Sequence, residues 1–259
     1  MSPKEINELW ADPILRHSNV LDGIFHQKVI ICESDSDCRF YSAILQAVIE
    51  EKNRSFPDCM FIHCGGKHRI PQVLKALKKL DVDVVVICDF DVLNSEEPLK
   101  KIVTTLNGNW EEIKPKWKNV KESIDKKRPE LETQDVKKEI SDILDAVSDR
   151  VFPKSEAKKI NTVLKKISAW SYAKQVGTSF IPSGDSTSNF QFIDSKFKEI
   201  GLHIVKVGEL EGFCRSVGNH GPKWVNKVLE KDLKTDLELE EARKFIEQII
   251  KEDGAEQRV

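Results

Sequence analysis

The chain has 259 residues, which is enough for one large domain or for a core domain with a substantial insertion. Hydrophobic residues make up 39% of it and charged residues 32%, and no apolar run approaches the roughly 20 residues that span a bilayer. This composition favours a folded protein without a membrane partner. The formal net charge of −2 lacks the basic excess of most nucleic-acid-binding domains, so only local charge can argue for such a partner.

The six cysteines lie mostly inside or beside apolar runs, and no two of them form a CxxC pair. This pattern is typical of small buried side chains in a reducing compartment. The first residues have neither the basic region nor the apolar region of a signal peptide. We therefore expect a cytoplasmic protein.

The first hundred residues alternate between predicted strands and helices. Short apolar runs rich in β-branched residues predict strands at Lys28–Cys32, Cys59–His63 and Val84–Cys88. Helical spacing of apolar residues predicts one helix over Arg39–Lys52, capped by Ser36 or Asp37. A glycine turn at 65–67 leads into another helix that reaches about Leu80, and a third helix is predicted to begin near Ser95. This order predicts an α/β fold with a parallel sheet flanked by helices.

The character of the chain changes after residue 106. Residues 107–175 are rich in Lys and Glu, contain no convincing strand, and predict two or more helices. Helical apolar stripes at 140–147 and 160–167 are expected to be packing faces, and the tryptophans at 110, 117 and 170 are expected to be packing anchors. Residues 177–188 are predicted to form a loop that returns to the core.

The last part of the chain predicts one more strand and two helices. The strand is expected at Leu202–Val207, and the helices at Lys223–Lys231 and Asp236–Glu252. The predicted organisation is therefore a core in two parts, residues 1–106 and 186–259, with a mostly helical insertion at 107–185.

Acidic residues follow three of the predicted strands. They stand at positions 33 and 37, 89 and 91, and 209 and 211. Because ligands of open parallel sheets bind outside the carboxyl ends of the strands, these acids are expected to meet at one edge. Close carboxylates repel one another unless a cation lies between them, and all-oxygen ligand sets suit Mg²⁺, Mn²⁺ or Ca²⁺. A pair of such ions supports phosphoryl transfer.

The alternative is that these acids are ordinary surface residues of loops. Three of them together, Glu33, Asp89 and Asp91, each after a buried run, favour the metal site. Asp35 is expected to face solvent. The choice between Glu209 and Glu211 stays open, because it depends on where the preceding strand ends.

The pattern Glu33 with Asp89-Phe90-Asp91 resembles the metal-binding pattern of Toprim domains. Further segments extend the resemblance to the Toprim half of OLD-family (overcoming lysogenization defect) endonucleases, to which the Gabija defence nuclease is related. These segments are ICESDSD at 31–37, GGK at 65–67, DFD at 89–91, GELE at 208–211 and HGPKW at 220–224. The resemblance covers most of residues 10–230, with 107–185 matching only as an expected insertion.

The resemblance implies a metal-dependent endonuclease or nickase that acts on DNA. Glu33 and Asp37 would bind one metal ion with help from Asp89, while Asp91 and Glu211 would complete the site or hold a second ion. Mg²⁺ or Mn²⁺ is implied as the cofactor, with Ca²⁺ as a supporting ion. A lysine after the last carboxylate is expected to stabilise transition-state charge, and Lys223 is the residue chosen; Glu33 and Lys223 are thus the expected catalytic residues.

Two features depart from the family pattern. Ser34 stands where Toprim motifs usually have glycine, which leaves the carboxylates intact. OLD enzymes also carry an ABC-type ATPase domain, whereas this chain has no Walker A motif, since its Gly66-Lys67 pair lacks the required spacing and the following Ser or Thr. The chain is therefore expected to be an excised nuclease domain, or else a stand-alone Toprim protein. In either case the ATPase domain or subunit that it would work with is not part of this sequence.

Two basic segments are candidates for contacts with DNA. Lys67, His68 and Arg69 open a helix after a glycine turn, where a phosphate can meet both positive charge and free N–H groups. The Lys-rich stretch at 114–127 could form a basic face. For both segments a solvated surface is the alternative.

Two other functions compete with the nuclease hypothesis. A haloacid-dehalogenase-type phosphatase also has a DxD after an apolar strand, with the first Asp as nucleophile. That family places its DxD after the first strand with Thr or Val two positions later, whereas here it follows the third strand with Leu93 at that position. The third hypothesis is a non-catalytic DNA-binding or regulatory Toprim module.

Overall fold

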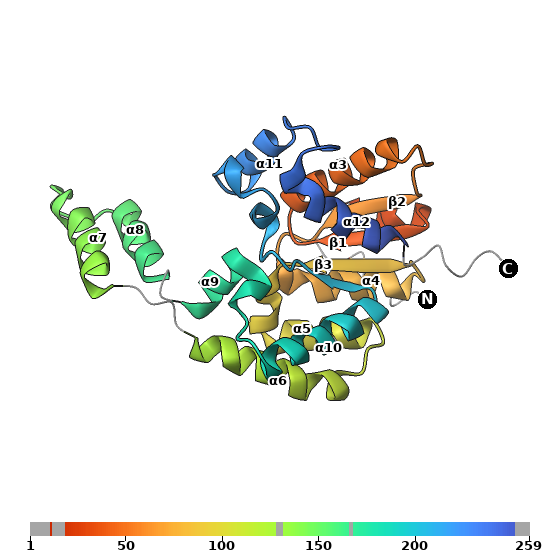
Figure 1. The fold of residues 1–259 in the computed structure, drawn as a ribbon, viewed down its shortest axis with the longest axis horizontal. Helices are drawn as coiled ribbons and strands as arrows, with labels where there is room; N and C mark the ends of the chain where they lie inside the picture. The colour runs from red at the N-terminus through yellow and green to blue at the C-terminus, as the bar shows by residue number, and fades with distance from the viewer. Residues whose placement is uncertain (1–10, 12–18, 128–131, 166–167, 252–259) are drawn as a thin grey trace.

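The computed structural model describes residues 11, 19–127, 132–165 and 168–251. Its centre is a parallel sheet of four strands in the order β2-β1-β3-β4 (Figure 1). The strands are β1 (Lys28–Cys32), β2 (Cys59–His63), β3 (Val84–Cys88) and β4 (Leu202–Ile204). The first three have the predicted bounds, and the predicted α/β class with a parallel sheet is confirmed.

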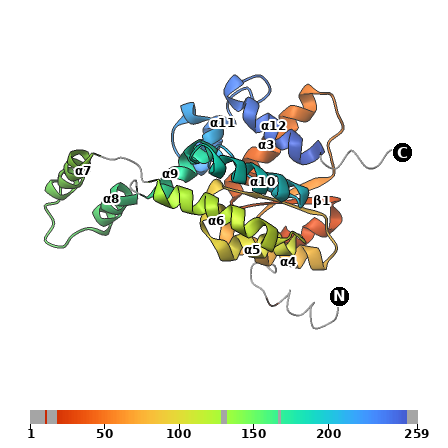
Figure 2. The same ribbon diagram turned by 60° about the horizontal axis from the view of Figure 1, so that its bottom comes forward.

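Helices cover both faces of this sheet (Figures 1 and 2). The α-helices have these bounds: α3 Asp35–Glu51, α4 Ile70–Lys79, α5 Glu96–Thr105, α6 Trp110–Lys126, α7 Thr133–Asp145, α8 Lys154–Lys165, α9 Ala169–Val176, α10 Asp185–Glu199, α11 Pro222–Val228 and α12 Glu240–Lys251. The short 3-10 helices are η1 Asn19–Phe25, η2 Lys67–Arg69, η3 Phe90–Asn94, η4 Gly177–Phe180, η5 Leu210–Phe213, η6 Arg215–Val217 and η7 Leu237–Leu239.

Alternation along β1 decides which helices lie on which face. Val29 and Ile31 are buried in a core with residues of α4, α5, α6 and α10, whereas Ile30 and Cys32 are buried in a second core with residues of α3, α11 and α12. Every residue of β1 and β3 is buried, as expected for strands covered on both faces. The strong β-branched runs of the sequence therefore correspond to the centre of the sheet.

The helical region after residue 106 divides into two parts. The predicted anchors Trp110, Trp117 and Trp170 are buried in the first core, which confirms their role in packing. By contrast, α7 and α8 pair with each other and project away from the sheet (Figures 1 and 2). In this arm Leu144 and Leu164 are about half exposed, while Val163 is buried. Ile167, predicted to end the second stripe, lies outside the described residues.

Several predicted boundaries were wrong, and tertiary contacts explain the larger differences. Residues 185–188 belong to α10, because burial of Phe190 and Phe197 stabilises a helix whose first turn is polar. The strand β4 ends at Ile204, and the Lys206 carbonyl then accepts a hydrogen bond from the Thr178 N–H. The last helix begins at Glu240, after Asp236 caps η7; Glu252, its predicted end, lies outside the described residues.

The cap of α3 was also predicted wrongly. The N-cap is Ser34, and the helix begins at Asp35, four residues before the predicted start at Arg39. Ser34 and Asp37 form a capping box, in which each side chain accepts a hydrogen bond from the other residue's backbone N–H. The remaining helices begin or end within a few residues of the predicted positions. Among the described residues, no helix is both long enough and apolar enough to cross a membrane.

Candidate metal centre

The segments that follow the four strands are joined at one edge of the sheet. The Gly66 N–H donates to the Glu33 carbonyl at 2.8 Å, and the Phe90 N–H donates to the Gly208 carbonyl at 2.8 Å. The first bond joins the loops after β1 and β2, the second joins the loops after β3 and β4, and all four loops border a cleft of about 310 Å³. The cleft is lined by Glu33, Ser34, Ser36, Asp37, Gly65, Gly66, Asp89, Lys174, Glu209, Leu210, Glu211, His220 and Gly221.

Glu33, Asp89 and Asp91 form the first acidic group of this edge. One carboxylate oxygen from each lies within 4.8 Å of the other two, close enough to share one metal ion. The Asp89 backbone N–H donates to Glu33 Oε1 at 3.2 Å, which fixes the glutamate beside the end of β3. Burial, together with the charges of Asp89 and Asp91, raises the pKa of Glu33 to about 8. Burial likewise raises the pKa of Asp89.

The surroundings of the two Asp91 carboxylate oxygens indicate that this group of acids can hold a metal ion. Its Oδ2 pairs with Lys67 Nζ at 2.5 Å. Its Oδ1 is buried and accepts no hydrogen bond from the described part of the chain. A buried oxygen left without a hydrogen bond is costly, and an ion would satisfy it. Oxygen ligands of this kind suit Mg²⁺, Mn²⁺ or Ca²⁺, so the donor set fits the predicted cofactor.

Asp37 lines the same cleft from the first turn of α3. Its Oδ2 accepts hydrogen bonds from the Ser34 N–H at 2.7 Å and the Ser34 hydroxyl at 3.0 Å. Burial and the charge of Asp89 raise the pKa of Asp37 to about 6, although the two bonds from Ser34 oppose this rise. Ser34 therefore positions an acid of the cleft, in addition to capping α3.

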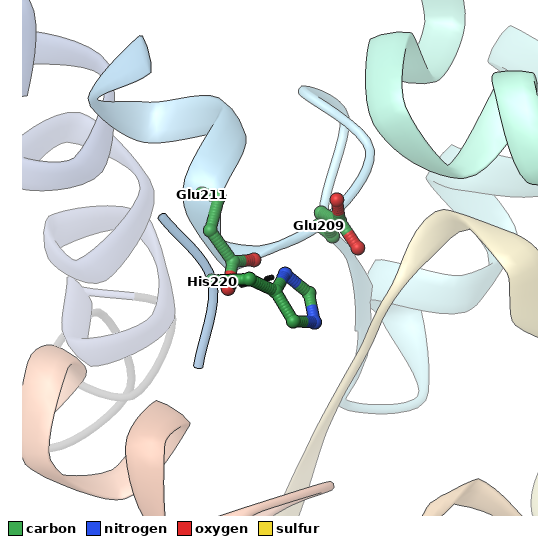
Figure 3. Close-up of side chains that lie close together, drawn as sticks. All are labelled: Glu209, Glu211 and His220. Carbon is green, nitrogen blue, oxygen red and sulfur yellow. Dashed lines mark ion pairs between the residues drawn. The ribbon is translucent and has the colours of Figure 1, made fainter. Parts of the chain in front are cut away.

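A second group contains Glu209, Glu211 and His220, whose nearest ligand atoms also lie within 4.8 Å of one another (Figure 3). His220 Nδ1 lies 2.8 Å from Glu211 Oε1, and the Gly221 N–H donates to the same oxygen at 2.6 Å. Burial and the charge of Glu211 raise the pKa of Glu209 to about 7. Both glutamates line the cleft, so the structure does not force a choice between them.

Lys174 is a charged residue of the cleft that the sequence analysis missed. It comes from α9, within the helical region, and its Nζ lies 2.8 Å from Asp89 Oδ2. It lies 3.9 Å from Glu209 Oε2 and 4.0 Å from Asp91 Oδ1. Burial alone would lower the pKa of Lys174, but the carboxylates around it raise the value above its ordinary range. No local motif marks this lysine, because its role depends on how α9 packs.

The four basic residues predicted to act at the site have different positions. Lys223 is exposed near the start of α11 and does not line the cleft, so its catalytic role stays a prediction. Lys67 is paired with Asp91 and is therefore tied to the first acidic group. His68 and Arg69 are exposed beside it in η2, and their contact with DNA stays a prediction.

Comparison with known proteins gives one family. Residues 24–91 match the model of the family described as "Overcoming lysogenization defect protein-like, TOPRIM domain". The matched segment contains Glu33, Asp37, Asp89 and Asp91, and it spans β1 to β3. No curated protein and no solved structure gave a significant match.

Proposed function

We propose that this chain, whose residues 24–91 form a Toprim domain of the OLD-like family, is a divalent-metal-dependent endonuclease or nickase that hydrolyses DNA. Toprim domains typically belong to metal-dependent enzymes that act on nucleic acids, which supports the broad class of activity. The observation that supports the nuclease activity is that two ligand groups border one cleft. Glu33 and Asp89 of the first group line it, with a buried carboxylate oxygen of Asp91 beside them, and so do all three members of the second group, Glu209, Glu211 and His220.

Each group has residues suited to hold one ion. Glu33, Asp89 and Asp91 would hold the first, with Asp37 beside them; Glu209 and Glu211 would hold the second, with His220 as a nitrogen ligand or as the partner that orients Glu211. Two bound divalent ions would supply an activated water and stabilise the leaving oxygen of the phosphodiester.

The chain's own residues would prepare the site for this chemistry. Hydrogen bonds from Ser34 to Asp37 and from the Asp89 N–H to Glu33 hold two acids in place. Exposed His68 and Arg69 would contact the DNA backbone and orient the duplex, a contribution that carries no sequence information.

An ABC-type ATPase is proposed as the controlling partner, as in the OLD enzymes that the chain resembles, in a genome-defence or DNA-processing system. This chain has no Walker A motif, so the ATPase would lie in another domain or subunit. Accordingly, adding ATP to this chain alone is expected to leave its rate of DNA cleavage unchanged.

The direct test is incubation with supercoiled plasmid in Mg²⁺, in Mn²⁺ or in EDTA. The proposal expects nicked or linear product with at least one metal and none in EDTA. Absence of product with both metals would contradict the proposal, and would favour the non-catalytic module if the chain still bound DNA. The phosphatase alternative predicts a trapped aspartyl-phosphate on Asp89 that disappears in Asp89→Asn, whereas the nuclease forms none.

A further inference from the structure

Lys174 lies between the two ligand groups. Its ammonium forms an ion pair with Asp89 of the first group at 2.8 Å and lies 3.9 Å from Glu209 of the second. The side chain is about one-third exposed, so the ammonium is reached from the cleft. It thus supplies positive charge at the place where the carboxylates of the two groups approach one another.

Two glycines fix the helix that carries this lysine. Gly208 has a φ of +110°, and a Cβ there would lie 2.1 Å from the Lys174 carbonyl oxygen. Gly177 has a φ of +62°, and a Cβ there would lie 1.9 Å from the Lys206 carbonyl oxygen. The end of α9 therefore rests directly on the backbone of residues 206–208, which leads into Glu209. This contact places the backbone of Lys174 beside the loop that carries Glu209, and the ion pair with Asp89 then places the ammonium.

We propose that Lys174 is a resident cation of the carboxylate cleft, which neutralises Asp89 and Glu209 in the metal-free protein and competes with divalent ions for them. The inference rests on the proposed metal site and adds to it a residue that regulates metal binding. In each ligand group the carboxylate oxygens lie within 4.8 Å of one another, where like charges repel strongly in a partly buried site, and the ammonium of Lys174 relieves that repulsion. A divalent ion entering the cleft has to displace the ammonium from Asp89. Because Lys174 lies outside residues 24–91, the helical region then sets how strongly the Toprim acids bind metal.

The test is calorimetric titration of the whole chain with Mn²⁺, together with its melting temperature in EDTA. Lys174→Met is expected to bind Mn²⁺ at least about tenfold more tightly than the wild type and to melt at a lower temperature in EDTA. Lys174→Arg retains the charge and is expected to stay close to the wild type in both measurements. Lys196→Met is the matched control, since Lys196 pairs with Glu112 and Glu199 outside the cleft.

Tighter Mn²⁺ binding by Lys174→Met distinguishes a competing cation from a residue that only supports the fold. A variant whose site was merely damaged would bind Mn²⁺ more weakly. Unchanged or weaker Mn²⁺ binding by Lys174→Met would overturn the inference while leaving the nuclease proposal standing. If neither the wild type nor the variant binds Mn²⁺, both proposals fail. If Lys174→Met does not fold in EDTA but folds when Mn²⁺ is added, the inference is supported; if it folds in neither, the titration is decided in the same way with Lys174→Gln.

Discussion

The backbone N–H of Asp89 donates a hydrogen bond to the Glu33 carboxylate at 3.2 Å, so the residue after β3 holds the side chain that follows β1. This bond connects the sheet to the proposed chemistry. The two strands are neighbours in the sheet, with Ile31 opposite Val86, so each delivers its acid to the same point. The sheet therefore determines the spacing of the first ligand group.

The metal-free protein is expected to lose stability as the pH rises from about 5 to 8. Burial and neighbouring acids raise the pKa of Glu33 from 4.5 to about 8, so in this window the folded state binds more protons than the unfolded state. The free energy of unfolding then falls with rising pH, by an amount on the order of a few kcal/mol. Glu209, with its pKa raised to about 7, adds a change of the same sign.

Thermal melting in EDTA across this pH range measures the effect. Glu33→Gln is expected to reduce the slope, because it removes the titrating group. Saturating Mg²⁺ is expected to flatten or reverse it, since metal binding requires ionised carboxylates. A melting temperature in EDTA that rises steadily from pH 5 to 8 would show that Glu33 is not held in a proton-retaining environment.

Ser34→Ala is expected to affect both the fold and the cleft. It removes the hydroxyl that caps α3 and that donates to Asp37, so the free energy of unfolding should fall by about 1 kcal/mol. Metal affinity should fall about tenfold, because Asp37 loses a positioning partner. Chemical denaturation and Mn²⁺ titration measure the two effects. Ser34→Thr retains the hydroxyl and should keep most of the stability and most of the metal affinity. Equal losses of stability and affinity in the two variants would exclude the hydroxyl as the cause.

Gly208→Ala is expected to displace α9 from the cleft. The new Cβ would lie 2.1 Å from the Lys174 carbonyl oxygen, so either α9 or the loop has to move, at a cost of roughly 1–3 kcal/mol or more. Gly184→Ala is the matched control, because Gly184 also has a positive φ, +98°, but a Cβ there meets nothing within 4 Å. A larger loss of stability in Gly208→Ala than in Gly184→Ala, measured by denaturation, isolates the clash. Equal losses would mean that backbone strain alone matters.

Arg69→Ala is expected to weaken DNA binding without a preference for sequence. If Arg69 neutralises one phosphate, the slope of log affinity against log salt should decrease in magnitude by about one. Arg54→Ala serves as the control, since Arg54 is exposed in the connection that leads into the opposite end of β2. Fluorescence anisotropy with labelled DNA at several salt concentrations measures both. An unchanged slope in Arg69→Ala would remove this residue from the interface.

The strands and the first acidic group could be predicted because their signals are local. Val84–Cys88 is a β-branched run buried on both faces, and Asp89 follows it directly, so burial and chain order alone locate the acid. The start of α10 could not be predicted in this way, because the polar residues 185–188 favour a turn until Phe190 is packed. Lys174 could not be predicted either, since it meets Asp89 only through the packing of α9 against residues 206–208.

The most direct test of the metal-dependent nuclease compares Glu33→Gln with Asp35→Asn in a plasmid-nicking assay with Mn²⁺. Both substitutions remove one negative charge, but Glu33 lies in the first ligand group, whereas Asp35 is exposed two residues away, as the sequence analysis expected. Glu33→Gln is expected to slow nicking by at least about 100-fold and to weaken Mn²⁺ binding, with Asp35→Asn close to the wild type. Wild-type nicking and Mn²⁺ binding in Glu33→Gln would contradict the nuclease proposal.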